Sequence, residues 1–148
     1  MKTVVFDIDG TIANNDHRKH FVEGKPKNWQ KYNARMDEDG VYEDIVWIMT
    51  NLWANTDVRI VLCTGREEVY REMTEDWLID KGIFHYVSDL YMRPANDYRS
   101  DAIVKVELLK QIESEWSRPY LWFDDRQQVV DAILAQGIRV MQVQEGNF

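Results

Sequence analysis

The chain has 148 residues, of which 45% are hydrophobic and 12% aromatic. This length fits one domain, residues 1–148, that buries a core without disulfides, and the single cysteine, Cys63, excludes an internal disulfide. A formal net charge of −8 argues against a surface that binds polyanions everywhere, because such binding needs many Lys and Arg contacts to phosphate. No stretch approaches the roughly 20 apolar residues of a membrane span and no signal peptide is evident, so we expect a cytoplasmic protein without a membrane partner.

Short β-rich apolar runs alternate with segments of helical period along the whole chain. This alternation predicts βαβ units, and hence an α/β fold: a Rossmann-like three-layer sandwich around a mainly parallel, five-stranded sheet. The expected strands are Thr3 to Ile8, Val58 to Cys63, Val87 to Met92, Tyr120 to Phe123 and Ile138 to Val143. The expected helices carry the apolar stripes Ile45 to Leu52, Val69 to Trp77, Val104 to Ile112 and Val129 to Leu134. Core packing is the default expectation for the tryptophans on or beside these stripes, at positions 47, 53, 77, 116 and 122.

The irregular segment from Ala13 to Gly40 follows the first strand, and we expect it to form a small lid insertion. Its part from His17 to Arg35 is basic within an acidic protein, and aromatic residues lie between the basic ones. Proteins that bind single-stranded nucleic acid combine charge and aromatic faces in this way, while a solvated helix with buried aromatics remains an open alternative. The basic residues are Arg18, Lys19, Lys25, Lys27, Lys31 and Arg35, and the aromatic ones are Phe21, Trp29 and Tyr32.

Polar residues that suit phosphate chemistry follow three of the expected strands. Open α/β sheets bind ligands beyond the carboxyl ends of their strands, so these residues are expected to meet at one edge. Neighbouring carboxylates repel one another unless a cation lies between them, and their hard oxygen atoms suit Mg²⁺. Lys105 follows Asp101 by one helical turn and is expected to pair with it. The strand-end residues are Asp7, Asp9, Gly10 and Thr11; Thr64, Gly65 and Arg66; and Asp124, Asp125 and Arg126.

These residues resemble the motifs of the haloacid dehalogenase superfamily, in the family order and over nearly the whole chain. The strings are VVFDIDGT, VLCTGR and LWFDDR, with Lys105 as the third motif. The sequence is also similar to the 3′-phosphatase domains of phage polynucleotide kinases. That likeness includes Arg18, MTEDW at Met73 to Trp77, the pair Asp101 and Lys105, and FDDRQQVVD at Phe123 to Asp131. No kinase-type phosphate loop occurs, so only phosphatase activity is implied.

The resemblance implies a role for each motif residue. Asp7 is the expected nucleophile and forms an aspartyl-phosphate, while Asp9 holds a proton near neutral pH and passes it to the leaving oxygen. The expected Mg²⁺ ligands are Asp7, the backbone carbonyl of Asp9, Asp124 and Asp125. Thr64 and Lys105 join the two aspartates as catalytic residues. Substrate contacts are expected from Gly10, Thr11, Arg18, Gly65, Arg66, Asp101 and Arg126.

The substrate itself stays open at this point. A 3′-phosphate on a nucleic-acid end is the leading interpretation, and a nucleoside monophosphate is the alternative. A phosphoacceptor receiver domain also uses strand-end aspartates, but it lacks the D-x-D-G-T string found at Asp7 to Thr11. No obligate protein partner is evident from the sequence.

Overall fold

A five-stranded sheet forms the centre of the protein in a computed structural model that describes residues 1–55 and 57–148. The strand order is β5-β4-β1-β6-β7, and every neighbouring pair in this sheet is parallel. All five expected strands are present, with shifted ends. They are β1 (Lys2–Phe6), β4 (Val58–Glu67), β5 (Val87–Arg93), β6 (Pro119–Asp124) and β7 (Val140–Gln142).

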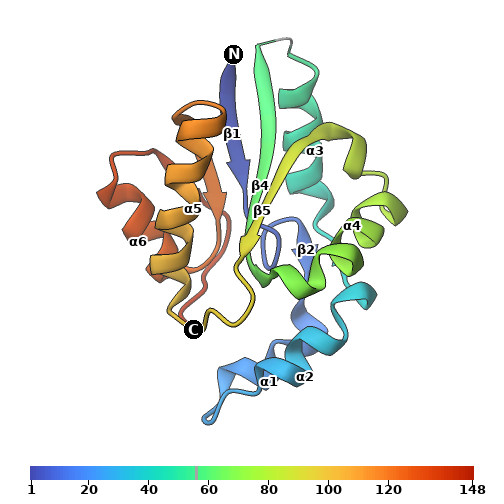
Figure 1. Ribbon diagram of the computed structural model, residues 1–148. Helices are drawn as coiled ribbons and strands as arrows, with labels where there is room; N and C mark the ends of the chain where they lie inside the picture. The colour runs from blue at the N-terminus through green and yellow to red at the C-terminus, as the bar shows by residue number, and fades with distance from the viewer. Residues whose placement is uncertain (56) are drawn as a thin grey trace.

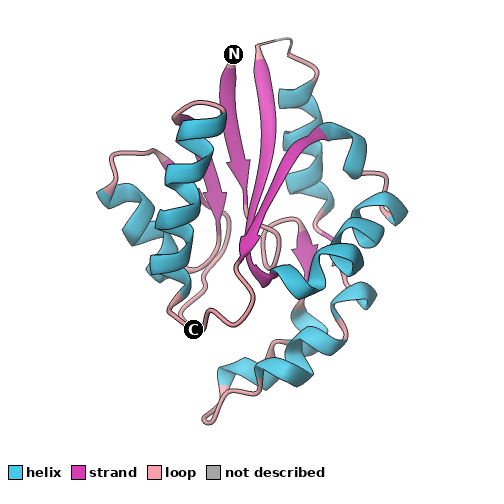
Figure 2. Cartoon of the chain, in the orientation of Figure 1, coloured by secondary structure: helices cyan, strands magenta, loops and turns pink. Residues whose placement is uncertain are grey.

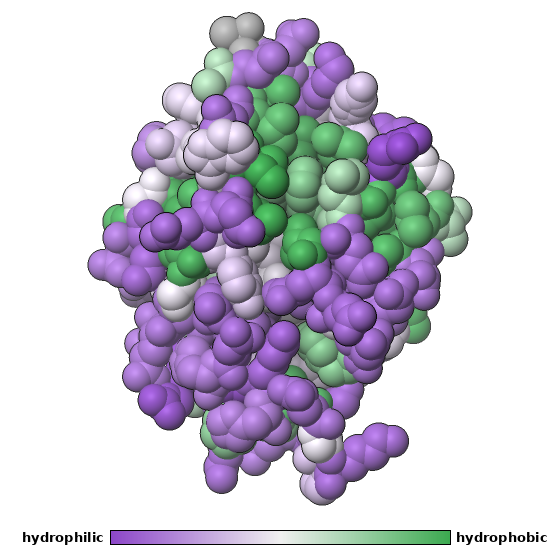
Figure 3. Space-filling view, turned by 180° about the vertical axis from the view of Figure 1, so that it is seen from behind, coloured by the Kyte–Doolittle hydropathy of each residue, from purple (hydrophilic) through white to green (hydrophobic). Residues whose placement is uncertain are grey.

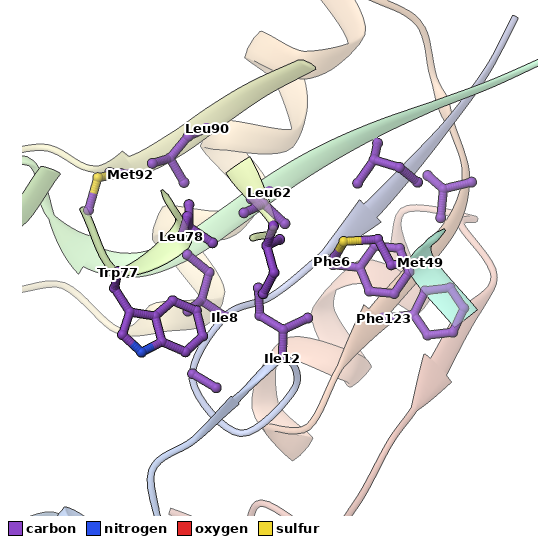
Figure 4. Packing of buried hydrophobic residues seen from close by; sticks show 14 residues of the cluster. Phe6, Ile8, Ile12, Met49, Leu62, Trp77, Leu78, Leu90, Met92 and Phe123 are labelled. Atoms are coloured by element: carbon purple, nitrogen blue, oxygen red, sulfur yellow. The ribbon is translucent and has the colours of Figure 1, made fainter. Parts of the chain in front are cut away.

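Helices cover both faces of the sheet, which confirms the three-layer prediction (Figures 1 and 2). One side carries α3 (Glu43–Trp53) and α4 (Arg71–Asp80), and the other carries α5 (Asp101–Glu115) and α6 (Gln127–Ala135). Successive side chains of a strand point to opposite faces, so Phe6 and Val5 belong to separate cores. Figure 4 shows the core under α3 and α4, where Phe6 stacks on Phe123 of the neighbouring strand with ring centroids 4.4 Å apart.

The segment 13–40 is more ordered than its sequence predicts. It contains a short antiparallel pair, β2 (Ala13–Asn14) with β3 (Gly40–Val41), and two short helices, α1 (His20–Glu23) and α2 (Trp29–Ala34). Two 3₁₀ turns, Asp16–Arg18 and Met36–Glu38, link these pieces. Both helices lie beyond the carboxyl ends of the sheet strands (Figure 1). The segment therefore lies at the edge where ligand chemistry is expected.

The tryptophans divide into two groups, and the expectation of core packing is wrong for three of them. Trp77 and Trp122 are 3% and 0% exposed, whereas Trp47, Trp53 and Trp116 are 67%, 45% and 38% exposed. A helical stripe specifies one buried face, and that face includes neither the side of α3 that carries Trp47 nor the ends of α3 and α5, where Trp53 and Trp116 lie. Figure 3 shows hydrophobic side chains gathered on the far side of the molecule from the viewer of Figure 1. None of the helices in the described ranges is long and apolar enough to cross a membrane.

Candidate active site

Three carboxylates and one ammonium group meet where β1 and β6 end. Asp7 follows β1, Asp124 is the last residue of β6, and Asp125 comes next. Lys105, on the second turn of α5, reaches between the two strands: its Nζ donates to Asp7 Oδ1 at 2.7 Å and to Asp124 Oδ2 at 2.8 Å. These side chains are almost fully buried. The parallel sheet thus brings together residues that are far apart in sequence.

This carboxylate cluster, Asp7, Asp124 and Asp125, holds more negative than positive charge. Burial raises the pKa of Asp7 well above its ordinary value and repulsion by Asp124 adds to this, although Lys105 acts in the opposite direction. One oxygen from each of the three carboxylates lies within 4.8 Å of the others. Asp125 Oδ2 is buried and has no hydrogen-bond partner among the described residues. A divalent cation with oxygen ligands would satisfy this atom and relieve the repulsion, so the cluster fits Mg²⁺.

Gly10 explains how Asp125 comes so close to the loop after β1. Its φ of +82° lies in the left-handed region, which favours glycine. A side chain at this position would also collide with the Asp125 carboxylate. Both the backbone conformation and the space therefore require glycine here.

The side chain of Asp9 is bound by two arginines. Arg18 Nη2 and Arg66 Nη2 donate to Asp9 Oδ1 at 2.6 and 2.7 Å. Burial would raise the pKa of Asp9, but Arg66 and Arg18 outweigh it and hold that pKa well below its usual range. The structure therefore differs from our expectation of a proton on Asp9 near neutral pH, because two guanidinium groups favour the carboxylate.

Arg18 has a different place from the one expected. Its side chain is fully buried, and besides Asp9 it contacts both carboxylate oxygens of Asp39 and the backbone carbonyl of Tyr32. The guanidinium of Arg18 is thus occupied by protein groups. Arg66 does line the pocket, although its guanidinium binds Asp9 and the hydroxyl of Thr74. Sequence reasoning missed Asp39, which belongs to no motif.

The remaining site residues lie around the same point, with one correction. Thr11 Oγ1 donates to Asp7 Oδ2 at 3.1 Å. Thr64 is buried, and its hydroxyl accepts a hydrogen bond from the Arg66 backbone N–H. Asp101 does not pair with Lys105 as expected, because Lys105 reaches past it to Asp7 and Asp124.

Asp101 instead pairs with two other basic residues beside the pocket. Its carboxylate lies 3.1 Å from Arg93 Nη2 and 3.5 Å from Arg126 Nη1. A side chain on Gly65 would collide with this carboxylate, so the Thr64 to Arg66 turn passes tightly against it. Arg126 Nε also donates to the carbonyl of Phe148 at 2.8 Å. Asp101 thus fixes Arg93 and Arg126 at the pocket wall.

A pocket of about 280 Å³ leads from Asp7 and Asp9 to the surface. Its outer part carries aromatic side chains from separate segments, and Trp29 and Tyr98 are 40% and 81% exposed. The lining also includes Tyr32, Gly65, Arg66, Arg93, Arg99, Asp101, Asp125, Arg126 and Phe148. The inner end is thus acidic and the mouth is aromatic and basic.

The fold and the site define the class of protein. An aspartate pair after β1, a threonine in β4, a lysine on α5 and an aspartate pair at the end of β6 meet at the carboxyl edge of a parallel sheet, and Asp7, Asp9 and Asp125 of this group line the pocket. This is the arrangement of a phosphatase of the haloacid dehalogenase superfamily. A haloacid dehalogenase-like hydrolase from Streptococcus pneumoniae shares the fold, with a TM-score of 0.68 over 96% of this chain and 84% of that one, at 13% identity.

Within this superfamily, the whole of residues 1–148 matches the family described as the polynucleotide kinase PNKP phosphatase domain, and the chain belongs to it. A chain in the structure of the Pnkp1/Rnl/Hen1 RNA repair complex is similar over 99% of this chain, with 31% identity and a TM-score of 0.80. A protein of Autographa californica nuclear polyhedrosis virus, named as a bifunctional polynucleotide kinase/RNA ligase, is 26% identical over 87% of this chain. The present chain spans only 43% and 17% of these two relatives.

Proposed function

We propose that this phosphatase is Mg²⁺-dependent and removes a 3′-phosphate from nucleic-acid ends through an aspartyl-phosphate on Asp7. The observation that carries the proposal is the pocket, which joins buried carboxylates at its inner end to exposed aromatic and basic side chains at its mouth. A phosphate ester would reach Asp7 while the attached nucleotide contacts Trp29 and Tyr98. Stacking on such aromatic faces is independent of base identity, which suits an enzyme that processes ends of any sequence.

In the first step a carboxylate oxygen of Asp7 attacks phosphorus as the bond to the 3′-oxygen breaks. Lys105 holds Asp7 Oδ1 and Thr11 holds Oδ2, so the carboxylate has one orientation before substrate arrives. Mg²⁺, when bound by Asp7, Asp124, Asp125 and the backbone carbonyl of Asp9, supplies positive charge beside the phosphoryl oxygens. The Thr64 hydroxyl and the Lys105 ammonium add donors on the protein side.

The leaving 3′-oxygen takes its proton from the carboxyl group of Asp9. The two arginines favour ionised Asp9 without substrate, and a phosphate dianion placed beside it opposes their effect and favours the protonated form. In the second step Asp9 takes a proton from water. The water oxygen attacks the phosphorus on Asp7, and inorganic phosphate and the Asp7 carboxylate are released.

The segment 13–40 is the proposed lid of a phosphatase domain made of residues 1–148, and it would contact the strand that leads to the end. Three lysines of this segment form no ion pair with any of the described residues, 1–55 and 57–148. They are Lys25, Lys27 and Lys31. Burial and the charges of Arg126 and Lys25 lower the pKa of Lys27. Lys27 Nζ and Arg126 Cζ each lie 5.7 Å from the centre of the Trp29 ring. A phosphodiester group would relieve this crowding of positive charge.

Pocket size favours one alternative, a nucleoside monophosphatase. The volume of about 280 Å³ lies just below the range of roughly 300 to 1,000 Å³ that is common for small-molecule sites. Such a pocket has room for a single nucleotide. The rest of an oligonucleotide would extend out of the pocket past its rim at Trp29. The two substrates therefore differ only in whether the rim is used.

A phosphate-release panel separates these functions. We expect 3′-phosphorylated oligonucleotides to give a higher kcat/KM than 5′-phosphorylated ones of the same sequence or 3′-mononucleotides, and the chelator EDTA to stop all release. RNA and DNA oligonucleotides should both be included, because one similar structure is an RNA repair complex. A higher kcat/KM for mononucleotides would replace the nucleic-acid-end function with the nucleotidase.

A further inference from the structure

Asp39 is a buried carboxylate whose position is fixed from several sides. It is 1% exposed and follows the 3₁₀ turn Met36–Glu38. Its Oδ1 lies 2.8 Å from Arg18 Nε and its Oδ2 lies 2.6 Å from Arg18 Nη2, a two-pronged contact. His17 Nε2 lies 2.7 Å from Oδ1. The Asp39 backbone carbonyl accepts a 2.9 Å hydrogen bond from Trp77 Nε1 of α4, which ties the end of the segment to the core.

Arg18 connects Asp39 to Asp9 and so fixes the position of the Asp9 carboxylate. Its planar guanidinium donates to Asp39, to the backbone carbonyl of Tyr32 at 3.1 Å and to Asp9 Oδ1 at 2.6 Å. The Tyr32 ring lies 4.1 Å from Arg18 Cζ and packs against the guanidinium. A rigid fork with these contacts has one orientation in the protein. The second arginine, Arg66, binds Asp9 from β4 and lies 3.6 Å from Asp39 Oδ2.

Charge explains why Asp39 matters to this arrangement. Asp9, Asp39, Arg18 and Arg66 form a charge quartet of two carboxylates and two guanidinium groups. Replacing Asp39 by Asn would remove one charge and place an amide N–H₂ where Arg18 now finds an acceptor. Arg18 would then have an unsatisfied donor in a buried place, and it would turn away or draw Asp9 with it.

We propose that Asp39 is a positioning residue: through Arg18 it holds the Asp9 carboxyl group in reach of the leaving oxygen. The proposal rests on the proton-transfer role of Asp9 put forward above. In that step the bond from phosphorus to the leaving oxygen breaks, the Asp7–phosphorus bond forms, and the Asp9 proton moves to the leaving oxygen. An alcohol needs this proton, whereas p-nitrophenolate leaves as a stable anion.

Two small substrates of similar size test the proposal. Benzyl phosphate releases an alcohol and p-nitrophenyl phosphate releases a stable phenolate, but both give the same phosphorylated Asp7. The ratio of their kcat/KM values, which include no step after the leaving group departs, therefore reports proton transfer to the leaving oxygen. Asp39→Asn should lower the benzyl to p-nitrophenyl ratio by roughly tenfold or more, a part of the roughly 10²- to 10⁴-fold that a general acid contributes. The matched control is Asp37→Asn, an exposed acid in the same turn, for which the ratio should not change.

The ratio does not change if part of the variant protein is unfolded, because unfolded protein lowers both kcat/KM values equally. A milder variant, His17→Ala, removes only the outer contact of Asp39 and should lower the ratio less, in the same direction. Equal loss of both kcat/KM values in Asp39→Asn would overturn the positioning role. Asp9→Asn tests the proton role of Asp9 by itself: if this variant too lowers both kcat/KM values equally, that role fails and the inference with it.

Discussion

The carboxylate cluster and the charge quartet lie beside the same pocket, which Asp7, Asp125, Asp9 and Arg66 line, but they differ in charge balance. The carboxylate cluster, Asp7, Asp124 and Asp125, has only Lys105 as a cationic partner and contains an oxygen without a hydrogen-bond partner among the described residues. The charge quartet has equal numbers of positive and negative groups, and its members are bonded to one another. The carboxylate cluster has excess negative charge and would bind a cation from solution. The charge quartet is neutral, and its ion pairs fix the position of Asp9. The comparison therefore separates the binding of Mg²⁺ from the positioning of Asp9.

The largest expected effect comes from the carboxylate cluster. Asp7→Asn removes the nucleophile and should reduce kcat by roughly a thousandfold or more, a scale known for the loss of a covalent nucleophile. The fold should remain, because the substitution also removes one of three repelling charges. Phosphate release and circular dichroism check the two parts. Activity within tenfold of the unchanged protein would contradict the covalent role.

Metal binding distinguishes the two groups directly. At Mg²⁺ concentrations near 100 times Kd, binding should stabilise the protein by about 2.7 kcal/mol, seen as a rise in Tm. Asp125→Asn should reduce this rise, because it removes one ligand from the carboxylate cluster. Asp39→Asn should keep it, since the quartet does not bind the ion. Loss of the Mg²⁺ effect in Asp39→Asn would mean that the two groups act as one.

Breaking the quartet should lower stability without any ligand. Asp39→Ala leaves Arg18 buried with one partner fewer, and removal of one member of a buried ion pair costs about 3 to 5 kcal/mol. Urea unfolding measures this change. The control is Glu38→Ala, whose pair with Arg35 is exposed and should contribute nothing measurable. Similar midpoints for Asp39→Ala and the unchanged protein would show that the quartet is not structurally important.

The smallest effects are expected at the pocket mouth, outside both groups. Combined replacement of Lys25, Lys27 and Lys31 by Ala should raise KM for a 3′-phosphorylated oligonucleotide and flatten its salt dependence. Trp29→Ala should cost about 1 to 3 kcal/mol of binding if a base stacks there. Hydrolysis of p-nitrophenyl phosphate should hardly change in either variant. An equal loss of kcat/KM for the oligonucleotide and for p-nitrophenyl phosphate would show that the nucleic-acid strand does not bind this surface.

Sequence patterns predicted the carboxylate cluster more completely than the charge quartet. Asp7, Asp124 and Asp125 follow or end buried strands, and the parallel topology alone brings such residues together. The orientation of Asp9 depends on Arg18 and Arg66, which come from different elements, and no local pattern records that choice. Asp39 was missed because its neighbours in sequence, Glu38 and Gly40, are exposed and carry no motif.

Contacts between residues far apart in sequence could also not be predicted from the sequence. Asp101 stands one helical turn from Lys105, which predicts an ion pair, yet Arg93 and Arg126 compete for it from other segments. Helical spacing placed α3 correctly but did not show that Trp47 lies on its outer face. For Asp101, contacts between distant segments outweighed the local pattern.

Trapping the phosphorylated enzyme would show whether Asp7 forms the covalent bond to phosphorus. Asp9→Asn protein would be mixed with p-nitrophenyl [³²P]phosphate and Mg²⁺, quenched in acid and digested with trypsin. Loss of the Asp9 carboxylate should slow attack by water, while p-nitrophenolate still leaves without a proton, so the intermediate should accumulate. We predict ³²P on the peptide from Thr3 to Arg18, and none when Asp7→Asn is added. Unlabelled protein that nevertheless releases p-nitrophenol in a single turnover would contradict the aspartyl-phosphate on Asp7.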